Sequence, residues 1–543
     1  GLESVSLSAN WMWPCKNKGE DHRLYLAVEA CSTFAINLGI NIPTGKDSLS
    51  MTQKYDKMNV LCPGTVIITA AGNCSDITNI ISPVLKEKGG DIYYIDMSND
   101  NFYLGGSAFA QIHKSIGKKA PTIKDDSYFK KAFNLIQKLI NNNKISSGHD
   151  IGSGGLITTL MEMCFPRLNI GMHIDLDDLE EEDTSKIFFS EKIGLILQSK
   201  FDIESILKKE KIKCIRIGSV VTKPILKVKN HSQLLELQIS KYRKKWMKIS
   251  SKMEQFQTKN DFAVVRAGNV VKQPLKFKFP SGFSGIYPKK KNDTVNAAVL
   301  REKGSNSERE MAYIMDMCGF KVRDVHMTDI IEGRENLKDI NFLVAVGGFS
   351  NSDVLGSAKG WAGAFKYNLN AKKIITDFFN RGDTLTLGVC NGCQLFIELG
   401  MINSDDKKKP KMEFNDSGKF ECIFSPVEIK KSSSIMMKSL EGSILGIWSA
   451  HGEGKFSFPY EEKKYEISGK YYYGKYPSNP NGSDFNTAML CSKDGRHLVM
   501  MPHLERSTFP WNWAHYPENR KKDSVSPWVI AFQNAYNWLI NLK

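Results

Sequence analysis

Two segments far apart in the chain carry residue types that could perform nucleophilic catalysis. Cys390 lies within Gly-Val-Cys-Asn-Gly-Cys-Gln, and His503 is followed two positions later by Glu505. A thiol can attack a carbonyl carbon, an imidazole can carry the proton, and a carboxylate can hold the imidazole in one tautomer. These residue types therefore predict a Cys-His-Glu triad.

The sequence around Cys390 predicts the elements that position the thiol. Residues 383–387 form a short, apolar and β-branched run typical of a buried strand, and residues 395–399 are typical of a helix. Cys390 is therefore expected on a strand-to-helix turn, where flanking glycines avoid clashes and the helix dipole favours a thiolate. A second strand is predicted at 497–501, just before the histidine.

Cys390 and Cys393 form a C-x-x-C pair, which leaves two other interpretations open. The pair could be a redox couple or half of a zinc site. The sequence has no second C-x-x-C and no closely spaced histidine pair to complete a zinc site. A redox couple would need a thioredoxin-like setting, which this pattern lacks, so the sequence favours Cys390 as nucleophile and Cys393 as a packed neighbour.

From Val295 to the C-terminus the chain resembles the class I glutamine amidotransferases. In detail it resembles the C-terminal domain of the large, single-chain phosphoribosylformylglycinamidine synthases of purine biosynthesis. The matching segments are 300–302, 324–327, 346–350, 353–356, 388–394, 451–454, 476–477, 479–483 and 501–506. The resemblance implies a flavodoxin-like, doubly wound parallel sheet with the cysteine at the carboxyl edge of a strand.

The same resemblance implies a role for each residue of the site. Cys390 would attack the side-chain amide of glutamine, His503 would pass a proton to the departing ammonia, and Glu505 would orient the ring. The residues expected to stabilise the oxyanion or to bind glutamine are Gly348, Phe349, Asn391, Gln394 and His451. For the turn at 451–454 a purely structural role is the alternative.

The chain departs from the family pattern at three places near this site. Asn351-Ser352 stands where the family has Tyr-Gly, Leu504 replaces a proline, and Phe414 replaces an arginine. None of these changes removes a reacting group. If the arginine docks against the synthetase half, its loss is expected to alter coupling between the two activities.

The N-terminal half resembles the second half of the synthetase module of the same enzymes. That module is a duplicated α+β fold of the aminoimidazole ribonucleotide synthetase type, in which ATP phosphorylates an amide oxygen and ammonia then displaces the phosphate. One partial copy is present here, carried by residues 7–12, 43–51, 149–150 and 154–156. The resemblance implies ATP and Mg²⁺ as cofactors.

A turn at Gly-Lys-Asp-Ser and a glycine later in the chain are expected to contact the phosphates of a nucleotide. One carboxylate is expected to bind magnesium. The residues are Lys46, Asp47, Ser48 and Gly152 for phosphate and Asp150 for the metal. As an alternative, Asp150 could cap the helix that follows Gly154. The match is incomplete, because Ile-Gly-Ser stands where the family has Arg-Ser-Asp after this aspartate, and residues 189–194 keep only one of two expected acids.

Length and composition indicate a folded chain of several domains. It has 543 residues, of which 41% are apolar and 24% charged, so three or four domains are expected. No apolar run is long enough to cross a bilayer, the start lacks a signal pattern, and eleven scattered cysteines suit a reducing compartment. These features predict a cytoplasmic protein without a membrane partner.

The formal net charge of +15 raises the alternative of nucleic-acid binding. The lysines are spread along the chain, with runs only at 289–291 and 407–409, and no nucleic-acid-binding motif occurs. Solvated surface charge is therefore the preferred explanation. A degenerate, basic nucleic-acid-binding protein stays open as an alternative.

The sequence therefore predicts four segments. Residues 1–80 form a sheet of a partial synthetase-like subdomain that opens mid-domain, 81–235 a second synthetase-like subdomain, 236–293 a connecting arm with one helical stretch, and 294–543 the glutaminase. The predicted activity is the ATP-dependent conversion of formylglycinamide ribonucleotide and glutamine to formylglycinamidine ribonucleotide. The missing synthetase half would lie in the same or a separate chain, and the alternative is a stand-alone glutaminase subunit that docks on it.

Overall fold

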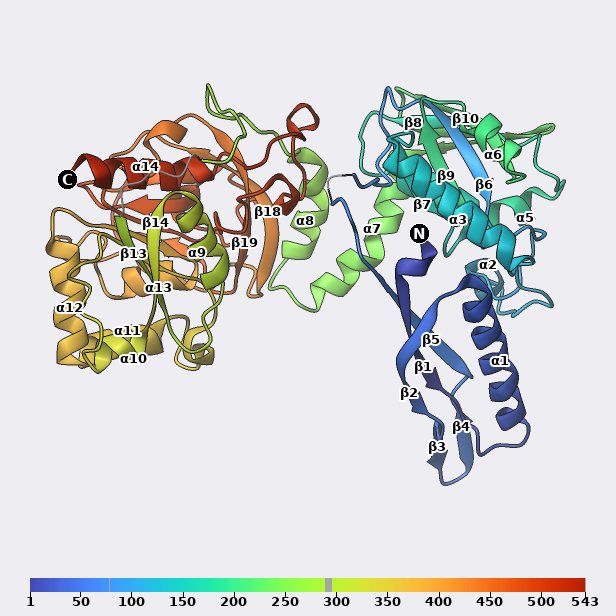
Figure 1. Cartoon of the computed structure of the whole chain (residues 1–543), viewed down its shortest axis with the longest axis horizontal. Helices are drawn as coiled ribbons and strands as arrows, with labels where there is room; N and C mark the ends of the chain where they lie inside the picture. The colour runs from blue at the N-terminus through green and yellow to red at the C-terminus, as the bar shows by residue number, and fades with distance from the viewer. Residues whose placement is uncertain (78, 289–294, 543) are drawn as a thin grey trace. The chain divides into compact units, whose positions relative to one another are not determined.

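A computed structural model describes residues 1–77, 79–288 and 295–542. The chain divides into two compact units, Gly1–Trp246 and Met247–Lys543 (Figure 1). The lysine run at 289–291 and the predicted boundary at 293/294 lie outside the described residues. Within the described ranges, no helix is both long enough and apolar enough to span a membrane.

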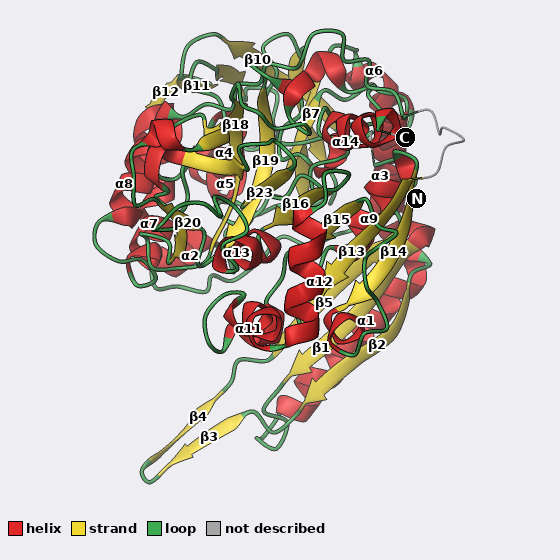
Figure 2. Ribbon diagram, turned by 90° about the vertical axis from the view of Figure 1, so that its left-hand side faces the viewer, coloured by secondary structure: helices red, strands yellow, loops and turns green. Residues whose placement is uncertain are grey.

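The first unit begins with a three-stranded sheet covered by one long helix. Strand β1 (Val5–Met12) pairs in parallel with β2 (Asn41–Ser48) and antiparallel with β5 (Thr65–Gly72). Helix α1 (Glu20–Leu38) ends at a left-handed Gly39. A hairpin of β3 (Thr52–Tyr55) and β4 (Met58–Leu61) projects from this sheet (Figure 2).

The prediction of a turn at Gly-Lys-Asp-Ser is wrong, because these residues continue β2 to its end. Gly45 lies opposite Ala9 of β1, and a Cβ on Gly45 would come 1.9 Å from the Ala9 carbonyl oxygen. The glycine is therefore needed for close strand pairing. A turn that presents amides to a phosphate is not formed here.

A seven-stranded mixed sheet, ordered β12-β11-β8-β10-β6-β9-β7, makes up the rest of the first unit. Only β11 and β8 run parallel, so this part of the chain is α+β. The bounds are β6 (Asp91–Asp96), β7 (Ser147–Asp150), β8 (Gly171–Asp175), β9 (Gly194–Ser199), β10 (Cys214–Val221), β11 (Ile225–Asn230) and β12 (Gln233–Gln238). The helices are α2 (Ala108–Ile112), α3 (Asp126–Asn141), α4 (Gly155–Cys164), α5 (Thr184–Phe189) and α6 (Ile203–Lys209).

The connecting arm holds two helices where one was predicted, α7 (Ile239–Gln255) and α8 (Phe262–Asn269). Within the second unit, Arg266 of α8 lies 2.5 Å from the carboxylate of Glu421 and 2.6 Å from that of Glu254. The Glu421 side chain is 2% exposed. A charge-assisted network therefore fastens α8 to strand β18 (Glu421–Ile429) of the second unit.

The second unit is built on a nine-stranded mixed sheet ordered β14-β13-β15-β16-β23-β22-β21-β18-β19. The first five strands in this order run parallel and the last four are antiparallel. The α/β fold class is confirmed, but the predicted parallel sheet is only the first half of the observed one. The antiparallel half comes from hairpin connections, which need no crossover helix.

Strands and helices alternate along the first part of this unit, up to α13 (Asn391–Glu398). The strands are β13 (Val295–Arg301), β14 (Phe320–His326), β15 (Phe342–Ala345), β16 (Leu385–Val389), β17 (Lys411–Glu413), β18 (Glu421–Ile429), β19 (Ile444–His451), β20 (Lys455–Ser457), β21 (Glu466–Tyr471), β22 (Thr487–Cys491) and β23 (His497–Met500). The helices are α9 (Glu308–Met317), α10 (Met327–Ile331), α11 (Lys359–Tyr367), α12 (Leu369–Asn380), α13 (Asn391–Glu398) and α14 (Val529–Asn541). β15 and β16 are buried along their whole length, as expected for central parallel strands.

Candidate active site

Cys390 occupies the single residue between strand β16 and helix α13. Its backbone has φ 52° and ψ −107°, a conformation that side-chain-bearing residues seldom adopt. The elbow is packed tightly, since a Cβ on Gly392 would lie 2.0 Å from the carbonyl oxygen of Ala345. The observed turn agrees with the predicted one and holds the thiol at the N-terminus of a helix.

The sheet brings the histidine to the cysteine, because β23 is the parallel neighbour of β16. The Cys390 amide donates to Met500 of that strand over 2.8 Å, and His503 follows three residues later. A Cβ on Gly347 would lie 2.7 Å from Cε1 of His503 and 3.3 Å from the Cβ of Cys390. Gly347 therefore leaves the space in which thiol and imidazole approach each other.

His503 and Glu505 form a buried pair. Nδ1 of His503 lies 2.6 Å from Oε1 of Glu505, and both side chains are at most 2% exposed. Burial lowers the pKa of His503, but the negative charges of Glu505 and Cys390 outweigh burial and raise it to about 10. Burial raises the pKa of Glu505, yet the attraction of His503 gives a net lowering. The pair is therefore arranged to stabilise a protonated imidazole.

The oxyanion residues predicted from the sequence lie around the thiol, but one of their amides is occupied. The Phe349 amide donates to Gly304 over 2.8 Å, so it cannot also bind an oxyanion. In the described part of the chain the amides of Gly348 and Asn391 donate to no protein acceptor. Asn391 is the first residue of α13, where amides lack an intrahelical partner. The amides of Gly348 and Asn391 are therefore the two that are free to stabilise an oxyanion.

A cavity of about 120 Å³ opens beside Cys390. It is lined by Gly348, Phe349, Asp353, Ser357, Cys390, Gln394, Phe414, Phe420, Ala450, His451, Gly452 and Glu453. Gln394 donates from Nε2 to the Glu453 carbonyl over 2.7 Å and accepts from Nδ2 of Asn391 over 2.9 Å. Of the residues predicted to bind glutamine or the oxyanion, Gly348, Phe349, Gln394 and His451 line this cavity with the thiol, whereas Asn391 does not line it.

His451 is held by Asn415, which the sequence reasoning did not assign to the site. The Gly454 amide donates to Oδ1 of Asn415, so this oxygen is an acceptor and His451 Nδ1, 3.3 Å away, is its donor. Burial, and then the charge of His503, lower the pKa of His451 to about 3. A neutral His451 therefore presents a bare Nε2, which has no partner in the described structure.

Cys393 lies on α13 and is fully buried. Burial, and then the nearby Cys390, raise the pKa of its thiol well above the usual range. In the part of the chain that the structure describes, no three His, Cys, Asp or Glu side chains gather as metal ligands. Cys393 is a core residue packed behind the nucleophile.

The predicted phosphate and metal residues of the first unit lie on two different sheets. Lys46, Asp47 and Ser48 end β2 of the three-stranded sheet, and Asp150 ends β7 of the seven-stranded sheet. The Asp150 side chain is 79% exposed, next to His149. Gly154 caps α4, so the alternative of Asp150 as a cap is wrong. One exposed carboxylate without further ligands is not a magnesium site, so Mg²⁺ does not fit these residues alone.

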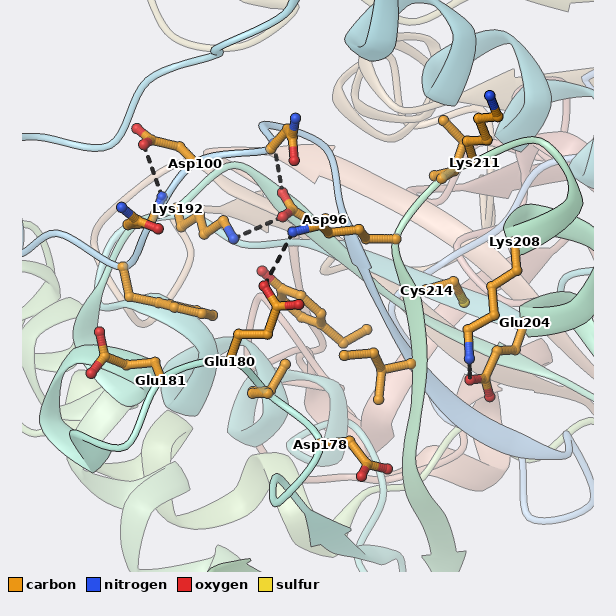
Figure 3. Close-up of a pocket in the computed structure, with 18 residues that line it drawn as sticks. Asp96, Asp100, Asp178, Glu180, Glu181, Lys192, Glu204, Lys208, Lys211 and Cys214 are labelled. Carbon is orange, nitrogen blue, oxygen red and sulfur yellow. Dashed lines mark hydrogen bonds and ion pairs between the residues drawn. The ribbon is translucent and has the colours of Figure 1, made fainter.

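A cavity of about 620 Å³ in the first unit contains none of the predicted phosphate residues (Figure 3). Inside it Lys192 points toward Asp96, with Nζ 2.8 Å from the carboxylate, and lies over the ring of Phe102. This buried ion pair was not predicted from the sequence.

Three family models match separate stretches of the chain, and one of them covers the unit that holds the cysteine elbow. Residues 294–539 match the CobB/CobQ-like glutamine amidotransferase domain, 1–73 the FGAR-AT PurM_N-like domain, and 101–230 the C-terminal domain of AIR synthase related proteins. The resemblance found in the sequence is thereby supported in three separate stretches.

Over nearly its whole length the chain is homologous to phosphoribosylformylglycinamidine synthases. It is 38% identical to a probable chloroplastic or mitochondrial member from Arabidopsis thaliana (99% of this chain, 40% of the relative). It is 36% identical to a probable member from Caenorhabditis elegans (99% of this chain, 45% of the relative). The chain thus spans less than half the length of these relatives. Among solved structures, Thermotoga maritima PurLQS matches with a TM-score of 0.35 and 23% identity, over 45% of this chain and 99% of that one.

Proposed function

We propose that the second unit is a glutaminase that releases ammonia from glutamine through a thioester at Cys390. The convergence of Cys390, His503 and Glu505 beside one small cavity is the observation that carries this proposal. An isolated C-x-x-C would not require the buried His-Glu pair. The resemblance to glutamine amidotransferases over residues 294–539 supports the same reading.

In the proposed mechanism the Cys390 sulfur attacks the side-chain carbonyl carbon of glutamine. The charge that develops on oxygen would be stabilised by the amides of Gly348 and Asn391. His503, held by Glu505, would give its proton to the departing nitrogen, and ammonia would leave. Water, deprotonated by His503, would then hydrolyse the thioester to glutamate and restore the thiol.

The ammonia would serve an ATP-dependent amidation of formylglycinamide ribonucleotide, which is the reaction named for the relatives. ATP would transfer a phosphoryl group to the amide oxygen, and ammonia would displace the phosphate. Because this chain spans 40% to 45% of those relatives, it would supply the glutaminase and only part of the synthetase. The rest of the synthetase would come from further sequence of the same or a separate chain.

Nucleotide contacts in the first unit belong to the same proposal. The sequence resemblance alone supports phosphate contacts from Lys46, Asp47, Ser48 and Gly152, and an auxiliary Mg²⁺ contact from Asp150 that residues outside this set must complete. A titration of the chain with ADP, with and without Mg²⁺, and its repeat with Asp150→Ala would measure this contribution. We also propose a cytoplasmic location, since the thiol of Cys390 must stay reduced to act.

Cys390→Ala tests the glutaminase. We expect the variant to lose glutamine hydrolysis, while any ammonia-dependent amidation by the reassembled enzyme is spared. Cys422→Ala, at an exposed cysteine outside the cavity, is the matched control. Equal loss of the glutamine-dependent and ammonia-dependent reactions would contradict the assignment.

A further inference from the structure

The cavity of about 620 Å³ in the first unit has no part in the proposed glutaminase mechanism. Three segments supply most of its lining: 99–102, which follow β6, 178–181, which follow β8, and 211–215, which lead into β10. All of them belong to the first unit. A volume in this range is typical of a site for a small organic molecule.

One polar group in the wall of this cavity is buried and unpaired. Tyr94 is 3% exposed, and its hydroxyl has no hydrogen-bond partner among the described residues. Burial, and then the charge of Asp96, raise the pKa of this hydroxyl well above its usual range, so it keeps its proton. A buried tyrosine hydroxyl usually has a partner. The hydroxyl of Tyr94 is therefore available to donate to a ligand.

Lys192 supplies a second donor in the same wall (Figure 3). It is 5% exposed, and its Nζ lies 2.8 Å from Oδ2 of Asp96 and 4.5 Å from the ring centre of Phe102. The Phe102 ring is also the neighbour of the Tyr94 ring, with 6.4 Å between their centres. An ammonium group has three N–H bonds, and in the described chain Asp96 is its one hydrogen-bond acceptor. Lys192 can therefore donate to a ligand as well.

The two buried carboxylates that line the cavity already have their hydrogen bonds. Oδ1 of Asp96 accepts from two backbone amides over 2.9 and 3.0 Å, and its Oδ2 accepts from Lys192. The side chain of Asp100 is 1% exposed, and its two oxygens accept from backbone amides over 2.8 and 2.9 Å. The buried groups left to meet a ligand are therefore donors, and they call for an acceptor oxygen.

Charges around the cavity are balanced. The buried lysine and aspartate neutralise each other, and the charged side chains nearer the surface form the pairs Glu180–Lys213, Glu204–Lys208 and Glu181–Lys186. The two others in the lining, Asp178 and Lys211, have opposite charges. An ion bound here would bring a buried charge without a partner, which is costly. An uncharged ligand is therefore favoured.

The rest of the lining offers apolar surface. It includes Phe102, Leu179, Ile212, Cys214 and Ile215. We propose that this cavity binds an uncharged organic molecule whose carbonyl oxygen accepts hydrogen bonds from Tyr94 and Lys192 and whose apolar body packs on these residues. An amide or a ketone has the required acceptor. A carboxylate or a phosphate would be repelled by Asp96 and Asp100, and an ammonium group by Lys192.

Three probes with the same ring test the charge of the ligand. Benzamide is neutral and has a carbonyl oxygen, benzoate is an anion, and benzylammonium is a cation. Each is titrated into the whole chain and followed by ligand-observed NMR, which measures weak dissociation constants. We expect saturable binding of benzamide, with a Kd at least about 10-fold lower than that of either ion, because burying an unpaired charge is costly.

Tyr94→Phe removes the hydroxyl and keeps the ring. We expect the Kd of benzamide to rise about 3- to 10-fold, which is the loss of one neutral hydrogen bond. The melting temperature of the ligand-free variant should not fall, because the hydroxyl has no protein partner to lose. Tyr465→Phe is the matched control, at a buried tyrosine outside this cavity, and should leave the Kd unchanged.

A second variant tests the other donor. Asp96→Asn combined with Lys192→Met replaces the ion pair by uncharged side chains, and the asparagine oxygen can still accept from the two loop amides. The Kd of benzamide should again rise about 3- to 10-fold, because one donor is lost. This double variant takes the place of Tyr94→Phe if the latter fails to fold.

Absence of saturable benzamide binding to the wild-type chain would overturn the inference, and so would an unchanged Kd in Tyr94→Phe. Benzoate or benzylammonium binding as tightly as benzamide would refute the assignment of an uncharged ligand. A lower melting temperature of ligand-free Tyr94→Phe would also overturn the inference, because it would mean that the hydroxyl already has a partner within the protein.

Discussion

Glu505→Gln tests the reasoning about the buried pair most directly. Glu505 and Cys390 raise the pKa of His503 from 6.5 to about 10 against the opposing effect of burial. At about 1.4 kcal/mol for each pH unit, this is about 5 kcal/mol of preference for the protonated ring. Glu505 contributes more than Cys390 to this preference, so we expect Glu505→Gln to lose the greater part of it and to lower glutaminase kcat about 10²- to 10³-fold.

The same variant has a second consequence for stability. A raised folded-state pKa stabilises the fold fully below pH 6.5, and the contribution is lost as pH rises toward about 10. Glu505 has a lowered pKa, so it stays ionised over this range. Wild type should therefore lose unfolding free energy between pH 6.5 and 10, and Glu505→Gln should lose much less. Denaturant unfolding at several pH values measures both curves.

The glutaminase rate is measured as the release of glutamate from glutamine. Glu461→Gln is the control, because the Glu461 carboxylate is 78% exposed and pairs with Lys463 at the surface. A kcat for Glu505→Gln within about threefold of wild type would refute the orienting role. Identical stability curves for the two proteins would refute the pKa argument, since the pair would then contribute nothing that depends on charge.

Two further changes test the packing around the site. Gly347→Ala places a methyl group 2.7 Å from His503, so we expect at least about 10²-fold lower glutaminase activity with the fold retained, as measured by kcat and circular dichroism. Gly382→Ala, where a Cβ meets nothing within 4 Å, should retain activity. Arg266→Ala leaves Glu421 buried without its cation and should cost about 3 to 5 kcal/mol of unfolding free energy.

The arginine prediction has its own control. Arg334→Ala removes a guanidinium that is 55% exposed, so its loss should cost no more than about 1 kcal/mol. Equal effects of the two arginine variants would show that the α8 contact is only a surface ion pair. An active Gly347→Ala enzyme would mean that thiol and imidazole do not need this close approach.

Local patterns were enough to predict the elements that carry the triad. The strand-to-helix turn at Cys390 and the strand before His503 follow from residue types within a few positions. The α/β class follows from the alternation of such elements. Each of these features is decided over short stretches, where a residue's neighbours in sequence are also its neighbours in space.

Sequence reasoning failed where a residue's partner lies far away along the chain. Gly45 looked like part of a phosphate-binding turn, but pairing with Ala9 makes it a strand residue. Phe349 was expected to offer its amide, but Gly304 accepts that hydrogen bond. The roles of the site residues and the four segment boundaries stay predictions.

By itself, then, the sequence determined that a thiol, an imidazole and a carboxylate are present and that the thiol lies on an elbow. Only the tertiary structure decided that they meet, because parallel pairing of β16 with β23 joins segments that share no local signal. The tertiary structure also decided that Asp353 and Glu453 lie close together, because Ser357 donates a hydrogen bond to each of them. Long-range backbone pairing and packing decide such contacts, and no local propensity encodes them.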